Sequence, residues 1–161
     1  MVYRLYTPAD FPALYAIEET CFQPPFRFRR RYMQYLVQVP NATTWIAEKD
    51  GRMAGFAIVE WDREMGDEIA YLQTIEVAPE QRGRGIGGEL LRRVEASTHT
   101  AGATVLWLHV DEQNAHAIRI YEAHGYMREG REEGYYAPDR PALVLVKYLG
   151  PGQANPPERG S

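Results

Sequence analysis

A basic, glycine-rich stretch near the middle of the chain has the residue types that bind phosphate. Glycine lacks a Cβ atom, so the backbone N–H groups of such a stretch can converge on an anion. A helix that starts there adds unpaired amides and about half a positive charge of dipole. We therefore expect the main chain and two arginine side chains to hold a phosphate-containing ligand. The residues are Arg82, Gly83, Arg84, Gly85, Ile86, Gly87 and Gly88.

Two familiar phosphate-binding loops can be compared with this stretch. A Walker-type loop ends in Gly-Lys-Ser or Gly-Lys-Thr, which is absent here. The dinucleotide fingerprint G-x-G-x-x-G fits at Gly83, Gly85 and Gly88. Asp111 also ends the next apolar run near the ~20-residue spacing of that fold's acidic residue. Residues 78–82, however, separate the strand from the first glycine, and too little chain follows for a six-stranded doubly wound sheet. Spacing alone leaves the dinucleotide alternative open.

A third pattern, Arg-x-x-Gly-x-Gly, occupies residues 82–87 and follows Ile-Glu-Val-Ala-Pro at residues 75–79. This combination resembles the GNAT superfamily of N-acetyltransferases, whose members hold the pyrophosphate of acetyl-CoA in this loop. The resemblance implies acetyl-CoA as the cosubstrate and the glycine-rich loop as its binding site. It also places the pantetheine arm on the main chain of Ile75 and Val77, where a strand that splays from its neighbour leaves backbone groups unpaired.

A second segment resembles the same family. Asn114 is followed seven residues later by Tyr121 and then by a Gly-Tyr pair at residues 125–126. With about 3.6 residues per turn, this spacing puts both side chains near one helical face. The resemblance implies that Asn114 binds the pantetheine and that Tyr121 donates a proton to the departing thiolate. The alternatives are a helix cap for Asn114 and a buried aromatic residue for Tyr121.

Two residues compete as the acceptor of the amine's proton. His109 lies in Trp-Leu-His-Val, which resembles a strand of the RimI-like branch, the N-terminal-alanine acetyltransferases of ribosomal proteins. That branch typically has glutamate at this position, but an imidazole also accepts a proton near neutral pH. Glu76 is the other candidate, because some GNAT members use a glutamate on the strand before the loop. A water chain to backbone carbonyls is the third possibility.

Aromatic residues predict where the acceptor binds. Tyr135 and Tyr136 resemble the Tyr-Tyr segment with which RimI-like enzymes cover a peptide's first residues, and Phe26 lies in a segment similar to their loop after the first helix. The Glu-Asp pair usual after Tyr-Tyr is replaced here by Arg140 and Pro141. We expect a protein or peptide N-terminal α-amine as acceptor, with a small-molecule amine or a lysine as alternatives. A non-catalytic coenzyme A or nucleotide sensor is the competing class of function.

Hydrophobic periodicity supplies the elements that must position these residues. Asp50 and Gly51 favour the left-handed dihedrals of a tight hairpin. Helices are expected at residues 8–19, 28–37, about 86–94 and 115–124, and strands at 3–5, 43–47, 54–59, 71–77, 105–110, 128–136 and 142–148. This order predicts an α/β or α+β domain with a mixed sheet flanked by helices. It is also the GNAT order, and the resemblance makes the sheet mostly antiparallel.

The bulk properties fit one domain. The chain has 161 residues, 45% of them hydrophobic, which is enough for a core and too few for two ordinary domains. We expect the domain at residues 1–149 and a flexible tail at residues 150–161, which has no apolar anchor. The net charge of −4 argues against nonspecific nucleic-acid binding. Both a monomer and a homodimer remain open.

The sequence gives no sign of a membrane anchor or a metal site. No apolar run approaches the ~18 residues of a membrane span, and the first residues lack a signal-peptide pattern. A single cysteine suits a reducing compartment. The four histidines form no spaced ligand set with carboxylates or cysteine; they are His99, His109, His116 and His124. We therefore expect a cytoplasmic protein without a bound metal.

Overall fold

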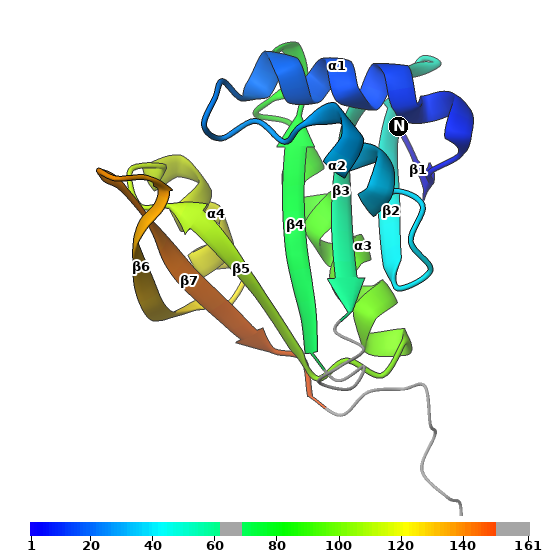
Figure 1. Cartoon of the computed structure of the whole chain (residues 1–161). Coiled ribbons are helices and arrows are strands. Elements are labelled where there is room, and N and C mark those ends of the chain that lie inside the picture. The colour runs from blue at the N-terminus through cyan, green and yellow to red at the C-terminus, as the bar shows by residue number, and fades with distance from the viewer. Residues whose placement is uncertain (62–68, 151–161) are drawn as a thin grey trace, which may run out of the picture.

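A seven-stranded sheet forms the frame of the molecule (Figure 1). The computed structural model describes residues 1–61 and 69–150. The spatial order of the strands is β1-β2-β3-β4-β5-β7-β6, and every neighbouring pair is antiparallel except β4 with β5. The strands are β1 Val2–Leu5, β2 Ala42–Lys49, β3 Arg52–Trp61, β4 Ile69–Val77, β5 Val105–Asp111, β6 Met127–Ala137 and β7 Arg140–Tyr148. The predicted mixed, mostly antiparallel sheet is confirmed.

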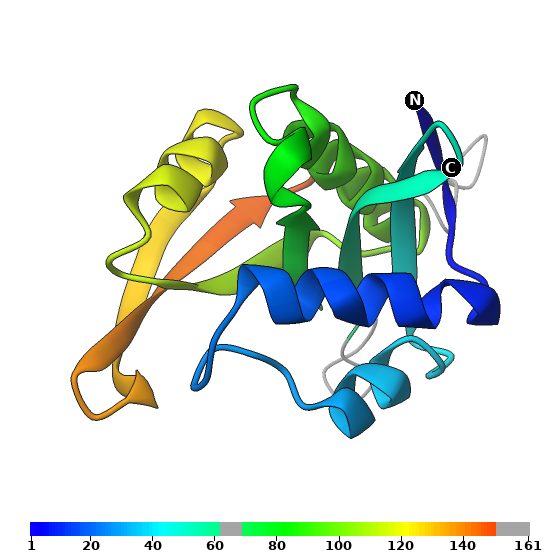
Figure 2. The same ribbon diagram turned by 90° about the horizontal axis from the view of Figure 1, so that it is seen from above.

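Helices cover both faces of this sheet (Figure 2). One face carries α1 and α2, and the other carries α3 and α4. Their bounds are α1 Phe11–Cys21, α2 Arg30–Leu36, α3 Ile86–Thr100 and α4 Ala115–Ala123, with 3-10 turns η1 at Pro8–Asp10 and η2 at Pro79–Gln81. All the predicted helices exist, with shifted ends. The tail predicted for residues 150–161 lies, after Gly150, outside the described residues and stays a prediction.

Each face has its own hydrophobic core, because strand side chains alternate between the faces. The larger core joins α3 and α4 to the sheet through residues such as Leu90, Leu91 and Leu106. The smaller core joins α1 and α2 to β2 and β3, with Leu14 and Phe56 fully buried. Burying a side chain of this size contributes about 1.5–3 kcal/mol. The sheet is therefore held rigidly between two helical layers.

A β-bulge interrupts the regular alternation in β4. Ile58 of β3 pairs with Thr74, and the next residue, Val59, pairs with Leu72, so that Gln73 has no partner. An extra residue in one strand shifts the alternation and increases the local twist. Leu72 points into the α3 core before the bulge, and Ile75 packs against that same core after it.

Beyond the bulge, β4 separates from its parallel neighbour. The two strands pair only where Ile69–Tyr71 lies beside Val105–Trp107, and then they diverge (Figure 1). Ala78 N–H bonds the Ala54 carbonyl on β3 at 2.8 Å. In an antiparallel ladder alternate residues bond the same neighbour, so the main-chain groups of Ile75 and Val77 face the gap. The open strand edge expected from the sequence is therefore present at Ile75, whereas the Val77 carbonyl accepts from Arg82 Nε at 3.1 Å.

Candidate active site

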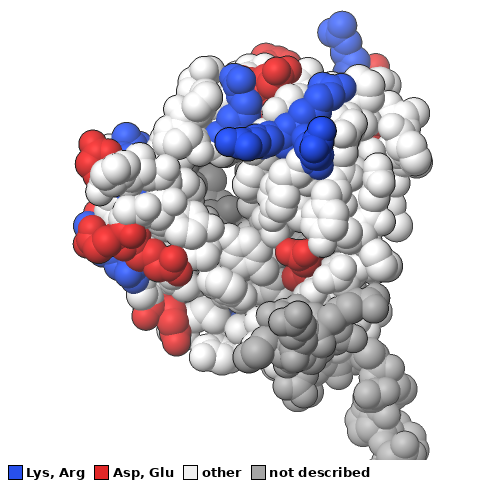
Figure 3. Space-filling model, viewed as in Figure 1, with Lys and Arg blue, Asp and Glu red and all other residues white. Residues whose placement is uncertain are grey.

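The divergence of β4 and β5 opens a cleft of about 840 Å³. Figure 3 shows the molecule hollowed between the β6–β7 hairpin and the side that carries α1 and α2. Seven of the residues that the sequence singled out line this cleft: Phe26, Ile75, His109, Asn114, Tyr121, Tyr135 and Tyr136. Glu76, Val77 and the glycine-rich loop do not belong to its lining.

The cleft passes from one face of the sheet to the other. Leu106 and Leu108 of β5 point into the core on the α3 side, so His109 between Leu108 and Val110 points to the α1 side. Tyr121 packs against the α3-side core. The proposed proton acceptor and proton donor therefore approach the cleft from opposite faces of the sheet.

The glycine-rich loop presents free amides at the start of α3. Gly83 and Gly85 both have a φ of 79°, a left-handed conformation that favours glycine. A Cβ atom on either would meet nothing within 4 Å, so backbone conformation rather than space requires glycine. The first turn at residues 86–88 has no backbone acceptor in the described part of the chain, and the ladder begins with Glu89 N–H bonding Gly85 O at 3.1 Å. Such amides suit an anion.

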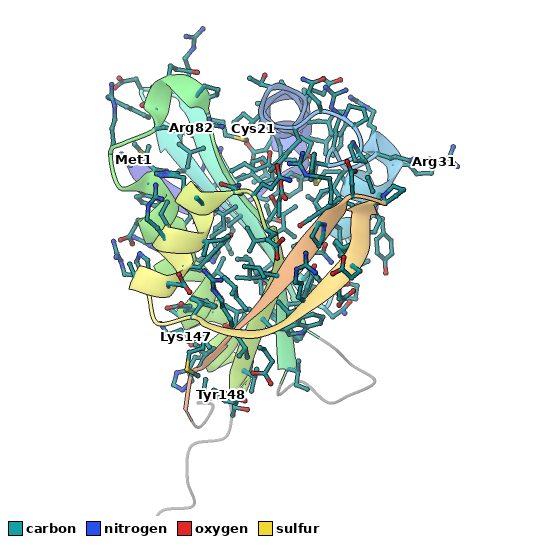
Figure 4. The ribbon with its side chains drawn as sticks, turned by 90° about the vertical axis from the view of Figure 1, so that its left-hand side faces the viewer. Met1, Cys21, Arg31, Arg82, Lys147 and Tyr148 are labelled. Atoms are coloured by element: carbon teal, nitrogen blue, oxygen red, sulfur yellow. The ribbon has the colours of Figure 1, made fainter. Side chains whose placement is uncertain are left out.

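The two arginines of this loop have different surroundings. Arg82 donates from Nε to the Val77 carbonyl at 3.1 Å and from its terminal nitrogen to Cys21 Sγ at 3.2 Å. Figure 4 shows Arg82 lying toward Cys21. Arg82 thus ties the loop to the end of β4, whereas the exposed Arg84 has no side-chain partner among residues 1–61 and 69–150. Of the two predicted cationic contacts, Arg84 is the one free to meet an anion.

Asn114 and Tyr121 stand two turns apart on one side of α4. Asn114 caps the helix, and its Oδ1 accepts from Ala117 N–H at 3.1 Å. The helix-cap alternative therefore holds, together with a place in the cleft lining. Burial, followed by the negative charge of Glu76, raises the pKa of Tyr121 above its usual range. Tyr121 is consequently a neutral phenol at physiological pH and can donate a proton.

His109 forms a hydrogen-bonded pair with a residue that sequence reasoning missed. The Tyr71 hydroxyl lies 2.7 Å from His109 Nδ1, and both side chains line the cleft. Burial raises the pKa of Tyr71 above its usual range, and the neighbouring Tyr135 hydroxyl adds to the effect. Tyr71 therefore keeps its proton unless a partner removes it, and His109 is placed to do so. The only sequence signal was a tyrosine at the start of the strand that leads to the glycine loop.

The three predicted acceptor-side aromatics meet at one wall of the cleft. Tyr135 stacks on the His109 ring with 4.1 Å between centroids and an interplanar angle of 14°. The ring centroid of Tyr136 lies 4.8 Å from that of Tyr135 and 4.9 Å from that of Phe26. The β6–β7 hairpin and the loop after α1 thus form an aromatic wall directly beside His109.

Glu76, the other candidate base, lies elsewhere. Its side chain is buried with 3% exposure, and its Oε2 accepts from Thr74 Oγ1 at 2.8 Å. One oxygen of Glu76 and one of the equally buried Glu18 have no hydrogen-bond partner. Burial and the adjacent Glu18 carboxyl raise the pKa of Glu76 well above its usual range. Because Glu76 does not line the cleft, the geometry favours His109 as the base.

The described residues contain neither a metal-binding cluster nor a membrane-spanning helix. Residues 1–61 and 69–150 contain no group of three or more His, Cys, Asp or Glu side chains that could hold a metal ion. Within the same ranges, every helix is too short or too polar to cross a lipid bilayer.

Known proteins share this sequence pattern and geometry. Residues 11–126 match the model of the acetyltransferase (GNAT) family. Streptothricin acetyltransferase of Streptomyces lavendulae is 38% identical over 87 residues, which are 54% of this chain and only 45% of that protein. The ribosomal protein bS18-alanine N-acetyltransferase of Salmonella typhimurium is 34% identical over 131 residues, with 79% of this chain and 81% of that protein covered.

A solved structure extends the likeness to the whole fold. The crystal structure of the ribosomal-protein-S18-alanine N-acetyltransferase from Escherichia coli superposes with a TM-score of 0.82 at 25% sequence identity. The match covers 98% of this chain and 97% of that chain.

Proposed function

The chain belongs to the acetyltransferase (GNAT) family, and on that premise we propose that it transfers the acetyl group of acetyl-CoA to a primary amine. Acetyl-CoA is the cosubstrate in this proposal. Its pyrophosphate lies against the free amides of the loop at residues 82–88, and its pantetheine arm lies along the open edge of β4 at Ile75. The carboxamide of Asn114 faces the same cleft.

One observation supports catalysis more than any other. The cleft holds a neutral phenol, Tyr121, on one face of the sheet and a hydrogen-bonded Tyr71–His109 pair on the other. Acetyl transfer needs a proton acceptor for the amine and a proton donor for the thiolate, separated by the reacting carbonyl. A sensor that only binds coenzyme A needs neither group, so the pair favours an enzyme over the sensor.

The reaction follows from these positions. The amine nitrogen attacks the thioester carbonyl in a ternary complex, and a strand amide near Val77 stabilises the oxyanion. The amine's proton passes to the Tyr71 oxygen while the Tyr71 proton passes to His109 Nδ1. The carbon–sulfur bond then breaks, Tyr121 protonates the departing thiolate, and the Tyr121 oxygen regains a proton from water. Glu76 remains outside this sequence of steps because its carboxyl group is buried beside Glu18 and accepts a hydrogen bond from Thr74.

The proposed acceptor is the α-amine of a protein N-terminus. The aromatic wall of Phe26, Tyr135 and Tyr136 stands beside His109, where the first residues of a peptide would lie. The bS18-alanine N-acetyltransferase relative acts on such an amine by its name and covers most of this chain. We expect the reaction to take place in the cytoplasm.

A small-molecule amine is the second candidate acceptor. The relative with 38% identity is named as an acetyltransferase of streptothricin, although this chain spans less than half of that protein. Arg140 and Pro141, which replace the Glu-Asp pair usual in RimI-like enzymes, also alter the acceptor side of the cleft.

Thiol release with a panel of acceptors tests the proposal. Acetyl-CoA is mixed with the protein and with N-terminal peptides, ε-amines of lysine or cationic small amines, and free coenzyme A is followed with a thiol reagent. We expect turnover with peptides that have a free α-amine and none with the same peptides after N-acetylation. Thermal protection by acetyl-CoA without release of thiol for any amine would support the sensor. Protection by NADH and not by acetyl-CoA would restore the dinucleotide alternative.

A further inference from the structure

Both ring nitrogens of His109 are engaged. Nδ1 lies 2.7 Å from the Tyr71 hydroxyl, and Nε2 lies 2.9 Å from Oε1 of Glu132 on β6. A bulge between Arg128 and Gly130 bends β6, and Glu132 reaches over β7 to the strand that carries His109. Tyr71, His109 and Glu132 therefore form a continuous hydrogen-bonded row from three strands.

The row has only one consistent proton arrangement. An ionised carboxylate accepts hydrogen bonds and cannot donate them, so His109 Nε2 must carry the hydrogen that faces Glu132. A neutral imidazole has one N–H group, which leaves the lone pair on Nδ1 to accept from the Tyr71 hydroxyl. The opposite tautomer would set a lone pair of Nε2 against the carboxylate.

Glu132 differs in its partner from Asp111 and Glu112, and from Glu60 of the cleft lining, which accepts from Gln73 Nε2 at 2.8 Å. Asp111 is paired with Arg140, and Glu112 is paired with Arg131. Glu132 has its hydrogen bond to His109 and contacts no arginine or lysine in the described part of the chain. Its negative charge is therefore available to His109 rather than neutralised by a guanidinium group.

The other groups around His109 carry no charge that would replace it. Tyr71 approaches from β4, Tyr135 stacks on the ring from β6, and Trp107 contacts it from its own strand. Its pairing partner on β7 is the apolar Val144. The His109 side chain is 8% exposed, whereas Glu132 is 51% exposed, so Glu132 links a buried imidazole to the surface.

We propose that Glu132 is a positioning residue for the acetyl transfer proposed above, on which this inference rests. Its carboxylate fixes the Nε2–H tautomer of His109 and stabilises the imidazolium that forms when His109 takes the Tyr71 proton. During attack, the N–C bond forms and the amine's proton moves to Tyr71. The Tyr71 proton moves to Nδ1, and the imidazolium returns it to water after the product leaves. Glu132 itself takes up no proton in these steps.

Kinetics of the Glu132→Gln variant test whether the negative charge of Glu132 acts on His109. Glu129→Gln is the matched control on the same strand. Glu129 is exposed, and its side chain has no hydrogen bond or ion pair with the described residues. We expect Glu132→Gln to lower kcat roughly tenfold, a modest loss because the half-exposed carboxylate is screened by water. The acidic limb of its pH–rate profile should move to lower pH, because the imidazolium loses its counter-charge. KM for acetyl-CoA should not change, and Glu132→Asp should recover part of kcat.

A second measurement does not depend on turnover. Long-range proton–nitrogen NMR correlations distinguish Nε2–H from Nδ1–H, and His109→Gln assigns the signals of His109. We expect the Nε2–H tautomer in the unaltered protein and in Glu129→Gln, and a mixture of tautomers in Glu132→Gln. Identical tautomers and identical pH profiles in the unaltered protein and Glu132→Gln would overturn the proposal. A protein that shows the tautomer change and yet acetylates no amine would instead overturn the proposed function.

Discussion

At the scale of residues, the structure distinguishes the two side chains that the sequence left open as the general base. His109 lines the cleft and contacts a phenol, whereas Glu76 is buried against Glu18 on the α1 side. We expect His109→Gln to reduce kcat roughly a hundredfold, the usual contribution of a general base. Glu76→Gln should keep most of the turnover. Steady-state rates at saturating acetyl-CoA decide the assignment, and the reverse order of effects would make Glu76 the base.

Tyr121 is expected to act on the leaving group and not on binding. Its hydroxyl stays protonated because burial raises the pKa of Tyr121. Tyr121→Phe should lower kcat while leaving the Kd of acetyl-CoA nearly unchanged, because the aromatic ring remains to pack. Calorimetric titration gives the Kd, and thiol release gives kcat. Unaltered turnover in this variant would remove Tyr121 from the proton-donor role.

Glu76 is instead expected to affect stability. Because burial and Glu18 raise the pKa of Glu76 in the folded state, the folded protein holds that proton more tightly than the unfolded chain. This stabilisation is complete below the ordinary value of 4.5 and is lost as the pH rises through the folded-state pKa. Gln at this position cannot ionise. The Tm of Glu76→Gln relative to the unaltered protein should therefore rise as the pH is raised above 4.5.

The control for this stability experiment is an exposed glutamate. Glu129→Gln should show no such trend in Tm with pH, because its carboxylate is exposed and has no partner to lose in the described structure. A parallel pH dependence of Tm for Glu76→Gln and the unaltered protein would contradict the buried proton.

At the scale of elements, the glycine-rich loop gives the sharpest prediction. Gly85 has a φ of 79° and is the N-cap residue of α3, so alanine there is strained by about 1 kcal/mol even though the space is open. We expect Gly85→Ala to lower the free energy of unfolding by that amount and to weaken acetyl-CoA binding, because the amides turn away from the pyrophosphate. Gly130→Ala is the matched control, since Gly130 also has open space and lacks a positive φ. Equal affinities for acetyl-CoA in both variants would argue against pyrophosphate binding by the glycine-rich loop.

Most elements could be predicted from the sequence because local chemistry sets them. Asp50 and Gly51 do have positive φ values, 52° and 76°, in the predicted hairpin turn. The helix expected from Pro8 begins instead with a 3-10 turn, because Asp10 Oδ2 accepts from Thr7 N–H at 2.8 Å before α1 starts. Helix and strand propensities together with turn residues therefore predict where an element lies, but they predict the geometry of its first turn less well.

The site could be predicted only in part, for a physical reason. Asn114 and Tyr121 share a helix, so their spacing alone brought them together. Tyr71, His109 and Glu132 come from three strands, and their meeting depends on two β-bulges that shift the register. No residue pattern marks the unpaired Gln73, and therefore neither the contact of Tyr71 with His109 nor that of Glu132 followed from the sequence.

At the scale of the whole molecule, the cleft crosses the sheet and so separates the two substrates. In the proposed reaction, coenzyme approaches from the side of α3 and α4, and the acceptor approaches from the aromatic wall. Joining the two ligands should make the second binding event intramolecular. We expect a peptide linked through its N-terminus to coenzyme A to raise the Tm more than acetyl-CoA or the peptide alone at equal concentration. The same peptide linked through its C-terminus should give no added gain, and equal gains from both conjugates would contradict the arrangement.

The outermost strand has a further consequence. β6 lies at one edge of the sheet, and its first nine residues are exposed to water. An unpaired strand edge of this length invites another chain to add to it, and interspersed charges are the usual protection. Arg128, Arg131 and Glu133 on β6 supply such charges alongside Glu132. Attempts to redesign the acceptor wall by making this hairpin more apolar should therefore lead to aggregation before they change specificity.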